Sequence, residues 1–566
     1  MKRSVYFSIS KVALCGLGLA PLLFCPAARA QCSTTVPCDP GPRPIGNQFA
    51  LFAGPVSGGV ALLPTPVHDT RQPPDANGNE GAGHVLNNAG AFGPFWGRAG
   101  AIFGQQATVT GIIDPATGNP TLLGLGPAFN GTSCFMCHSQ PAIGGTSPSL
   151  NPQLGAAHAF GASNPENLSA FITSTGPIRE ARFITDPADT SRNTLDGGVH
   201  ELFTIQGRSD APTGCVLAQP DFITQISNNN VIFRIPTPTF GLGLVENVAD
   251  VDLAANLQAS SASATAAAAA SAAATPQSAA PAVVQPGILN RNGNDGTVTR
   301  FGWKAQNKSL LLFAGEAANV EMGVTNELFN NEKVPGSGCA SNGLPEDFTH
   351  VVFPHGDTDP DVDAFVSSAI ENFATFMRIN GAPAQCDFAS GVDPTGAAVC
   401  NPLSASALAG RNVFSRIGCA ACHTLILTTA PSSVPGLSNR TFFPFSDFAL
   451  HHMGSNLADG VTQGLAGPDM FRTAPLWGLG QRLFFMHDGR ANNLIDAILA
   501  HDSDNRCFNT NNVSNFVVTF PGSGEVNFNS SVQTHSCGSE AHGSVTNFKN
   551  ATPGDRQNLL NFLRSL

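Results

Sequence analysis

Two short runs, Cys134-Phe135-Met136-Cys137-His138 and Cys419-Ala420-Ala421-Cys422-His423, share one pattern: two cysteines separated by two residues, then a histidine. In this pattern the two thiols bind the vinyl groups of a haem, and the histidine binds its iron from the proximal side. A single copy would also be compatible with a redox-active cysteine pair, but two copies in one chain favour haem. The sequence therefore predicts two covalently bound haem c groups, with His138 and His423 as proximal iron ligands.

The N-terminus has the pattern of a secretory signal peptide. Basic residues precede an apolar run from about Val12 to Cys25, and Ala28-Arg29-Ala30 offers a cleavage site of small residues. A lipoprotein signal ending at Cys25 is the alternative, but the large Phe24 disfavours it. No later stretch is long and apolar enough to span a bilayer. We therefore expect residues 1–30 to be removed and the mature chain to be periplasmic, with no membrane span.

The charge balance indicates which partners to exclude. The sequence has 28 Lys and Arg against 40 Asp and Glu, a formal net charge of -12. Removal of residues 1–30, which hold basic but no acidic residues, would make the chain more acidic still. Nucleic acid and anionic lipid are therefore not expected as partners.

The cysteines outside the signal segment and the two haem motifs indicate disulfides. Their even number fits an oxidising compartment. Proximity in sequence favours the pairs Cys32–Cys38, Cys386–Cys400 and Cys507–Cys537, and this leaves Cys215–Cys339 as a long-range pair. Sequence alone does not determine the connectivity, so other pairings stay open.

The distribution of the motifs predicts the fold. We expect a mainly α protein made of two cytochrome c-like haem domains with long ordered loops, over residues 31–385 and 386–566. Residues 254–285 stand apart, because they are mostly Ala, Ser and Pro. Alanine would allow a helix there, but the run has no apolar face to dock. We expect a mobile low-complexity insertion without chemistry.

An internal repeat supports two related modules. Phe-Arg-Ile-Pro-Thr-Pro-Thr-Phe-Gly-Leu-Gly at 233–243 is similar to Phe-Arg-Thr-Ala-Pro-Leu-Trp-Gly-Leu-Gly at 471–480, and each copy follows one haem motif. Duplication of a haem-binding module explains this pattern. Two unrelated loops rich in Pro and Gly are the alternative.

Several further motifs resemble those of the di-haem oxidoreductases, a family related to the bacterial di-haem cytochrome c peroxidases. The similarity runs from about residue 120 to the C-terminus, apart from the insertion. The motifs lie at Phe301–Ala305, Glu321–Gly323, Leu450–Gly454, Thr473–Gly480 and Met486–Ala491, with a closing helix at 556–566.

The resemblance implies a division of labour between two haems. Trp303 would lie between them and carry electrons, and Glu321 would be the acid and base that moves a proton during peroxide cleavage. The haem of His138 would be reactive, and the haem of His423 would receive electrons from an external donor, a small cytochrome or a cupredoxin. The oxidant would be a small molecule. The alternatives are a core aromatic role for Trp303 and a solvated helix position for Glu321.

The chain departs from the family pattern at three places. Lys304 follows Trp303 where the peroxidases have Asp, and His452 replaces an Asp. The glutamine that usually precedes the catalytic glutamate is missing near Phe313. These differences weaken the expectation of an efficient hydrogen peroxide reductase.

The resemblance also implies a sixth ligand for the second haem. In the peroxidases, a methionine fourteen residues after the histidine of a His-Asp-Gly segment ligates the second iron. Here that histidine is His487, and position 501 is a histidine. His501 continues the helical face of Leu494, Ala497 and Ile498. His451 is the main rival, followed by Met486 and Met453, and a role for His501 in capping the helix is the alternative.

Some questions stay open at this point. The sixth ligand of the His138 haem is undetermined, and His158 and His200 are equally compatible with that role. The oxygen-rich run at 290–296 fits either a calcium site or an Asn/Gly turn. Two other functions compete with a peroxidase: a dioxygen-dependent oxygenase like the distantly similar rubber oxygenases, and a di-haem electron carrier without catalysis.

Overall fold

The computed structural model describes residues 32–42, 93–382 and 403–566, apart from short gaps. The gaps lie at 34, 110, 114–119, 123, 161–168, 170, 207, 261–286, 334–337, 340–346, 348–349, 353–363, 504–515, 520–524 and 529–537. The signal segment, the predicted domain boundary at 385/386 and the pairs Cys386–Cys400 and Cys507–Cys537 lie outside the described residues.

The fold is mixed rather than mainly α. Helices make up 33% and strands 12% of the described residues. The prediction of a mainly α fold with two cytochrome c-like domains is therefore wrong. The physical reason lies in the composition: 59 Gly and 42 Pro interrupt helices, and the intervening loops pair in short antiparallel ladders. The main apolar core also joins distant parts of the chain, from Phe103 to Trp477.

The helices are short, and most begin at a side-chain cap. Those described are α2 (Gly93–Gly104), α3 (Cys134–Cys137), α4 (Pro152–Ala159), α5 (Phe222–Ser227), α6 (Leu242–Glu246), α8 (Leu310–Met322), α9 (Ala369–Ile379), α10 (Ala405–Arg416), α11 (Leu494–Ala500), α12 (His542–Asn550) and α13 (Pro553–Ser565). Three single turns of 3-10 helix are η4 (Cys419–Ala421), η5 (Pro435–Leu437) and η6 (Leu479–Gln481).

The strands form small antiparallel sheets. They are β1 (Ile112–Ile113), β2 (Pro120–Leu122), β3 (Ala128–Phe129), β4 (Glu180–Phe183), β5 (Val199–His200), β6 (Phe203–Thr204), β7 (Val231–Arg234), β8 (His350–Val352), β9 (Ala364–Val366), β10 (Leu427–Thr428), β11 (Thr441–Phe442), β12 (Leu450–His452), β13 (Met470–Arg472), β14 (Phe516–Thr519) and β15 (Glu525–Phe528). The described three-stranded sheet has the order β5-β4-β7, and it places Glu180 opposite Arg234.

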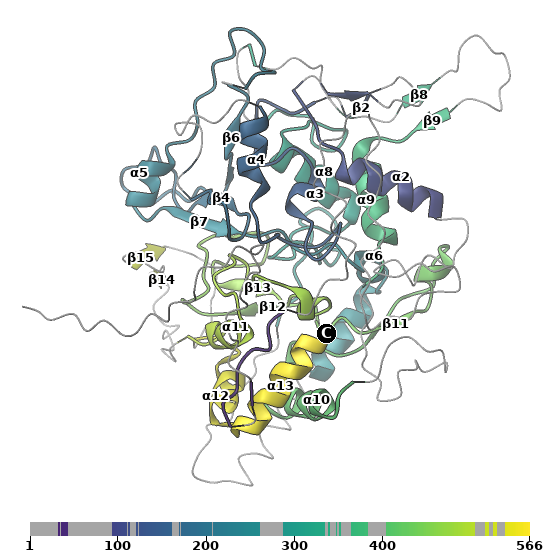
Figure 1. The fold of residues 1–566 in the computed structure, drawn as a ribbon, viewed down its shortest axis with the longest axis vertical. Helices are drawn as coiled ribbons and strands as arrows, with labels where there is room; N and C mark the ends of the chain where they lie inside the picture. Colours follow the sequence, from purple (N-terminus) through teal and green to yellow (C-terminus); the bar gives the residue numbers. More distant parts are fainter. Residues whose placement is uncertain are drawn as a thin grey trace, which may run out of the picture.

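Each haem motif lies beside a pair of packed helices. In Figure 1, α2 and α9 lie near α3 in the upper part, and α10 and α13 pack together in the lower part. A phenylalanine from each pair faces the proximal histidine: the ring centroid of Phe103 is 6.1 Å from that of His138, and that of Phe414 is 6.3 Å from that of His423. The two halves thus repeat one local arrangement.

The crossing of α10 and α13 depends on a glycine. A side chain at Gly410 would bring its Cβ within 1.9 Å of the carbonyl oxygen of Asn558. The absence of a side chain therefore allows the two backbones to approach closely. Phe414 of α10 then packs edge-on against Phe562 of α13, with ring centroids 5.6 Å apart.

The two copies of the internal repeat adopt the same local structure. The first begins in β7 and the second in β13, so Arg234 and Arg472 each end a strand. Each copy then reaches a glycine in the left-handed region, with φ 65° at Gly241 and φ 70° at Gly478, and a short helix follows. This agreement supports duplication over two unrelated loops.

The start of the predicted insertion is ordered. Residues 250–260 are helical, and Asn256 and Ser260 of this helix contact Thr424. The start at 254 was therefore predicted too early, because Leu253, Ala254 and Leu257 provide apolar contacts to the core. Residues 261–285 lie outside the described residues.

Two of the four predicted disulfides are confirmed. Cys32–Cys38 closes a short loop, and Cys215–Cys339 joins positions that are 124 residues apart. Among the described residues, no helix is long and apolar enough to cross a membrane.

Candidate functional site

The first motif presents its histidine in an orientation suited to iron. Ser133 caps α3 by accepting a hydrogen bond from the backbone N–H of Met136, and His138 follows the helix. The Nδ1–H of His138 donates to the carbonyl oxygen of Gly145 at 3.0 Å. Because a carbonyl can only accept, the proton lies on Nδ1, and Nε2 keeps its lone pair for a metal. Burial lowers the pKa of His138 to about 4, so the imidazole is neutral.

The second motif is arranged in the same way. The Nδ1–H of His423 donates to the carbonyl oxygen of Phe445 at 2.8 Å. Burial lowers the pKa of His423 to about 4. Thus both predicted proximal histidines are neutral, and in both Nε2 is the nitrogen that keeps the lone pair.

Each motif opens into its own pocket. The first pocket is lined by Cys134, Cys137 and His138, together with residues of β4 and α8. The second pocket is lined by Cys419, Cys422 and His423, together with residues of β13 and α11. None of the four cysteines of the motifs forms a disulfide in the described part of the chain.

The side chains that line the second pocket suit a haem group. Its lining is largely apolar, but two buried guanidinium groups, of Arg472 and Arg482, also face it. Burial lowers the pKa of each to about 10, and Arg472 keeps a buried Nη1 without a hydrogen-bond partner. No described carboxylate pairs with either group. Haem carries two propionates, which are natural partners for buried guanidinium groups.

Trp303 is the one described residue that lines both pockets. Its side chain is buried, and its Nε1–H donates to the carbonyl oxygen of Ile235 at 2.8 Å. Its ring lies edge-on to that of His487, with centroids 6.4 Å apart. Trp303 therefore belongs to a small apolar cluster and also occupies the shared wall, which is the position predicted for an electron bridge.

Glu321 lies in the first pocket at the C-terminal end of α8. Gly323 ends this helix with φ 67°, and a Cβ at Gly126 would come within 1.9 Å of the carbonyl oxygen of Gly323. The close approach lets the carbonyl oxygen of Glu321 accept from the N–H groups of Asn130 and Gly131. These hydrogen bonds hold the end of α8 against the segment that precedes the first motif.

The carboxyl group of Glu321 is held in its protonated form. Burial and the nearby Glu180 carboxylate raise its pKa to about 8, and its Oε2 accepts from the Nδ2 of Asn130 at 3.0 Å. Burial also opposes ionisation of Glu180, but Arg182, at 2.8 Å, and Arg234 outweigh it and lower the pKa of Glu180. The pair thus separates into one acid and one carboxylate, because two adjacent carboxyl groups do not both ionise readily.

Lys304 and His452, two basic residues that depart from the family pattern, each pair with a carboxylate elsewhere in the chain. The Nζ of the fully buried Lys304 lies 3.0 Å from Asp459, and Arg234 binds the other oxygen of Asp459 at 2.6 Å. The Nδ1 of His452 lies 3.0 Å from Asp469. A basic residue replaces an acid at both positions, and both charges are compensated inside the protein.

The second pocket contains the predicted sixth ligand and its rivals. His501 follows α11 and lies on the same wall as Leu494, Ala497 and Ile498. Its Nδ1 donates to the carbonyl oxygen of Ala497 at 2.7 Å, which leaves Nε2 free. The same bond is the helix-capping contact that the alternative interpretation requires. Capping through Nδ1 is compatible with ligation through Nε2, so the ligand role stays a prediction.

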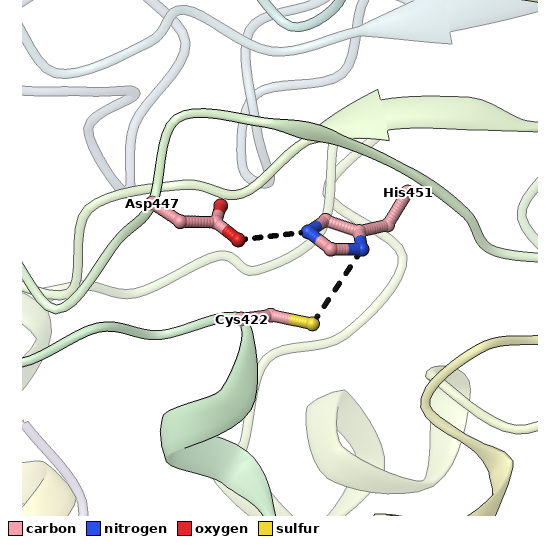
Figure 2. A group of neighbouring side chains, drawn as sticks. All are labelled: Cys422, Asp447 and His451. Atoms are coloured by element: carbon pink, nitrogen blue, oxygen red, sulfur yellow. Dashed lines mark hydrogen bonds and ion pairs between the residues drawn. The ribbon is translucent and has the colours of Figure 1, made fainter. Parts of the chain in front are cut away.

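His451 is poorly placed to be a ligand. Its Nε2 lies 2.9 Å from Asp447 and its Nδ1 lies 2.6 Å from Glu540. Figure 2 shows the ring between Asp447 and Cys422, whose sulfur lies 3.6 Å from Nδ1. Burial disfavours a charge on His451, but the groups around it raise its pKa well above the usual value. Both ring nitrogens of His451 thus already contact carboxylates. Met453, Met486 and His487 also line the pocket.

Three other predicted positions can be placed. His158 is exposed and His200 pairs with Asp196 at 3.0 Å, and neither lines the first pocket. Within the run at 290–296, Asp295 pairs with Lys308 and the N–H of Asn292 donates to Thr297. These are the contacts of a tight turn, and a calcium site there stays a prediction.

Several residues of the site escaped the sequence analysis. Glu180, Arg182 and Arg482 belong to no motif, and strand pairing or loop packing brings them to the pockets. Arg234 and Arg472 occupy equivalent positions in the two copies of the internal repeat. This equivalence is a sequence signal that could have indicated one arginine in the lining of each pocket.

The chain also matches a known protein family. Residues 194–515, more than half of the chain, match the family described as "Di-haem oxidoreductase, putative peroxidase". No curated protein and no solved structure matches the chain.

Proposed function

The chain belongs to the di-haem oxidoreductase family, and on this basis we propose that it reduces a peroxide in the first pocket with electrons that enter through the second. One observation carries the proposal: the lining of the first pocket includes both Glu321, whose pKa is raised to about 8, and Trp303, which also lines the second pocket. When bound, haem supplies the iron that exchanges electrons and cleaves the peroxide bond.

Glu321 and Glu180 would manage protons in the first pocket. Reduction of one peroxide to two waters takes up two electrons and two protons. Glu321 can donate a proton from its carboxyl oxygen to the departing oxygen, and it can be reprotonated from solvent. Glu180 remains ionised and keeps the proton on its neighbour. Among the described residues that line this pocket, His138 is the one histidine.

Trp303 would shorten the path between the two pockets. Its ring occupies the wall that they share, and Ile235 holds its orientation through the Nε1 hydrogen bond. Electrons would reach the second pocket from a small cytochrome or a cupredoxin. Export to the periplasm, where such donors reside, follows from the predicted signal segment at 1–30.

We further propose that Cys134 and Cys137 bind one haem covalently, and that Cys419 and Cys422 bind the other. Mass spectrometry of the denatured mature chain should then show the polypeptide carrying two haems. Substitution of both cysteines in one motif with Ala should remove one haem from this mass and leave the other. A denatured wild-type chain without bound haem would contradict covalent attachment, although non-covalent haem could still support the activity.

A further inference from the structure

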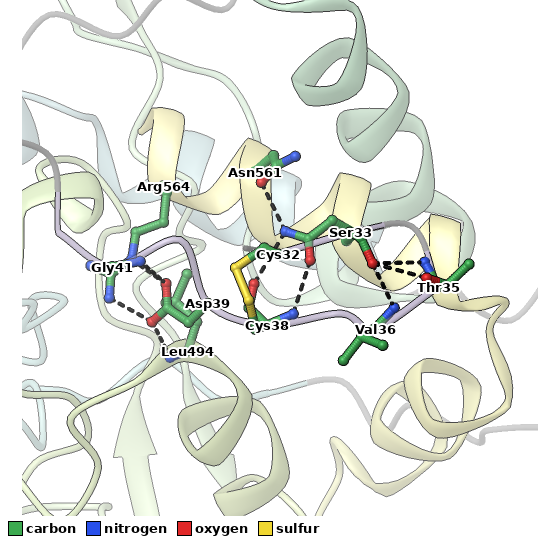
Figure 3. Close-up of a disulfide and its surroundings, with 11 residues drawn as sticks. Cys32, Ser33, Thr35, Val36, Cys38, Asp39, Gly41, Leu494, Asn561 and Arg564 are labelled. Carbon is green, nitrogen blue, oxygen red and sulfur yellow. Dashed lines mark hydrogen bonds and ion pairs between the residues drawn. A yellow bond between two sulfur atoms is a disulfide. The ribbon is translucent and has the colours of Figure 1, made fainter. Parts of the chain in front are cut away.

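Residues 32–42, here called the N-terminal strap, lie against the elements that surround the second pocket. The disulfide Cys32–Cys38 closes the strap into a loop, and Figure 3 shows this loop beside α13. The side chain of Gln557 in α13 pairs with the backbone of Cys38 in both directions, at 2.9 Å to its N–H and 3.1 Å to its carbonyl.

Asp39 connects the strap to two helices at once. Its Oδ1 and Oδ2 accept from Nε and Nη2 of Arg564 at 2.7 and 2.6 Å. Its Oδ2 also accepts from the backbone N–H of Leu494 at 2.8 Å, as Figure 3 shows. Leu494 is the first residue of α11, whose initial N–H groups have no partner inside the helix. Both charged side chains are buried, with 7% of Asp39 and 4% of Arg564 exposed.

Arg564 extends this connection to the pocket wall. Its Nη1 donates to the carbonyl oxygens of Leu479 and Arg482 at 3.3 and 3.0 Å. Its guanidinium carbon lies 5.3 Å from the ring centroid of Phe485. Leu479, Arg482 and Phe485 all line the second pocket, as does the face of α11 that ends at His501.

We propose that Asp39 is a positioning residue that holds α11, and with it His501, against the second haem. The inference rests on the proposed function and on the prediction that His501 is the sixth ligand of that haem. The carboxylate holds the start of α11, and the capping bond to Ala497 holds the ring of His501 on the end of the same helix. Loss of the contact between Asp39 and Leu494 would let this short helix shift, and the shift would move Nε2 of His501 away from the iron.

The test compares Asp39→Asn with the wild-type holoprotein. The substitution removes the charge that pairs with Arg564 but keeps the size of the side chain. The second haem should become partly high-spin, and its affinity for cyanide should rise by about 10–100-fold, the usual size of effects from residues behind a metal ligand. The spectrum of the first haem should not change. Asp39→Glu, which keeps the charge, should restore most of the low-spin signal.

Two further variants make the outcome decisive. Asp555→Asn removes another carboxylate of α13, whose ion pair with Arg416 is partly exposed, and it should behave as wild type. His501→Ala is measured in parallel. If it opens the second haem while Asp39→Asn stays closed, the positioning role is overturned. If both stay closed, the ligand assignment fails and the positioning role fails with it. Should Asp39→Asn yield no holoprotein, Gln557→Leu loosens the strap more mildly, and a wild-type result there would overturn the proposal.

Discussion

Glu321→Gln is expected to lower peroxide turnover by about 10²–10⁴-fold, the loss typical of a positioned acid or base. Glutamine has nearly the same size and can still accept from Asn130, but its amide does not release a proton. The absorption spectra of both haems should stay as in the wild type, because no described contact joins Glu321 to either proximal histidine. Steady-state peroxide consumption with excess donor measures the effect.

The pH dependence of peroxide turnover should also differ between the wild type and Glu321→Gln. The pKa of Glu321 is raised to about 8, so its acid form is present below that value and lost above it. Turnover should therefore fall as the pH rises through about 8, and this inflection should be missing in Glu321→Gln. Glu180→Gln removes the neighbouring negative charge and should move the inflection to lower pH.

A matched control separates this role from general effects of removing a carboxyl group. Burial also raises the pKa of Glu332, but Glu332 does not line the pocket. Glu332→Gln should keep wild-type turnover. Equal turnover in Glu321→Gln and wild type would show that another group supplies the proton.

His501→Ala is expected to open the second haem to added ligands. Its affinity for cyanide should rise by more than about 100-fold, beyond the range of indirect effects. In the wild type, ligation by two histidines predicts a low-spin haem without a methionine–iron charge-transfer band. Its reduction potential should lie below that of a haem with one histidine and one methionine. Optical titration with cyanide and a redox titration measure these properties.

The outcome also distinguishes the rival ligands. His542 pairs with Asp502 at 2.6 Å outside the pocket lining, so His542→Ala is a matched histidine control and should leave both haem spectra unchanged. If the second haem of His501→Ala remains low-spin and closed, another ligand is in place. His487 would then be the first to test, because both nitrogens of His451 are engaged by carboxylates.

The sequence predicted those parts of the site whose chemistry requires neighbouring residues. The two haem motifs, Trp303, Glu321 and His501 belong to short patterns, and the structure places them around two pockets. The sequence did not predict Glu180 as the partner of Glu321. These two residues are 141 positions apart, and the pairing of β4 with β7 determines where Glu180 lies. The carboxylates that compensate Lys304 and His452 are remote in sequence for the same reason.

The fold class was predicted wrongly for a related reason. Short helices at the haem motifs suggested a mainly α protein, but ladders of two to four residues leave almost no periodic signal. The pair β12–β13, for example, joins Leu450 to Arg472 and thereby brings two family motifs together. The N-terminal strap was visible only as a close cysteine pair, because nothing near Asp39 in the sequence indicates Arg564.

We propose that peroxide is reduced in the first pocket by electrons that enter through the second. The most direct measurement is peroxide consumption by the purified protein carrying both haems, with a reduced small cytochrome c as donor and dioxygen excluded. Two donor molecules should be oxidised for each peroxide lost, and the first haem should bind cyanide while the second should not. If no peroxide is consumed, the proposed peroxide reduction is contradicted. If both haems are then also closed to cyanide, the protein is an electron carrier. If it cleaves an apolar substrate only in the presence of dioxygen, it is an oxygenase.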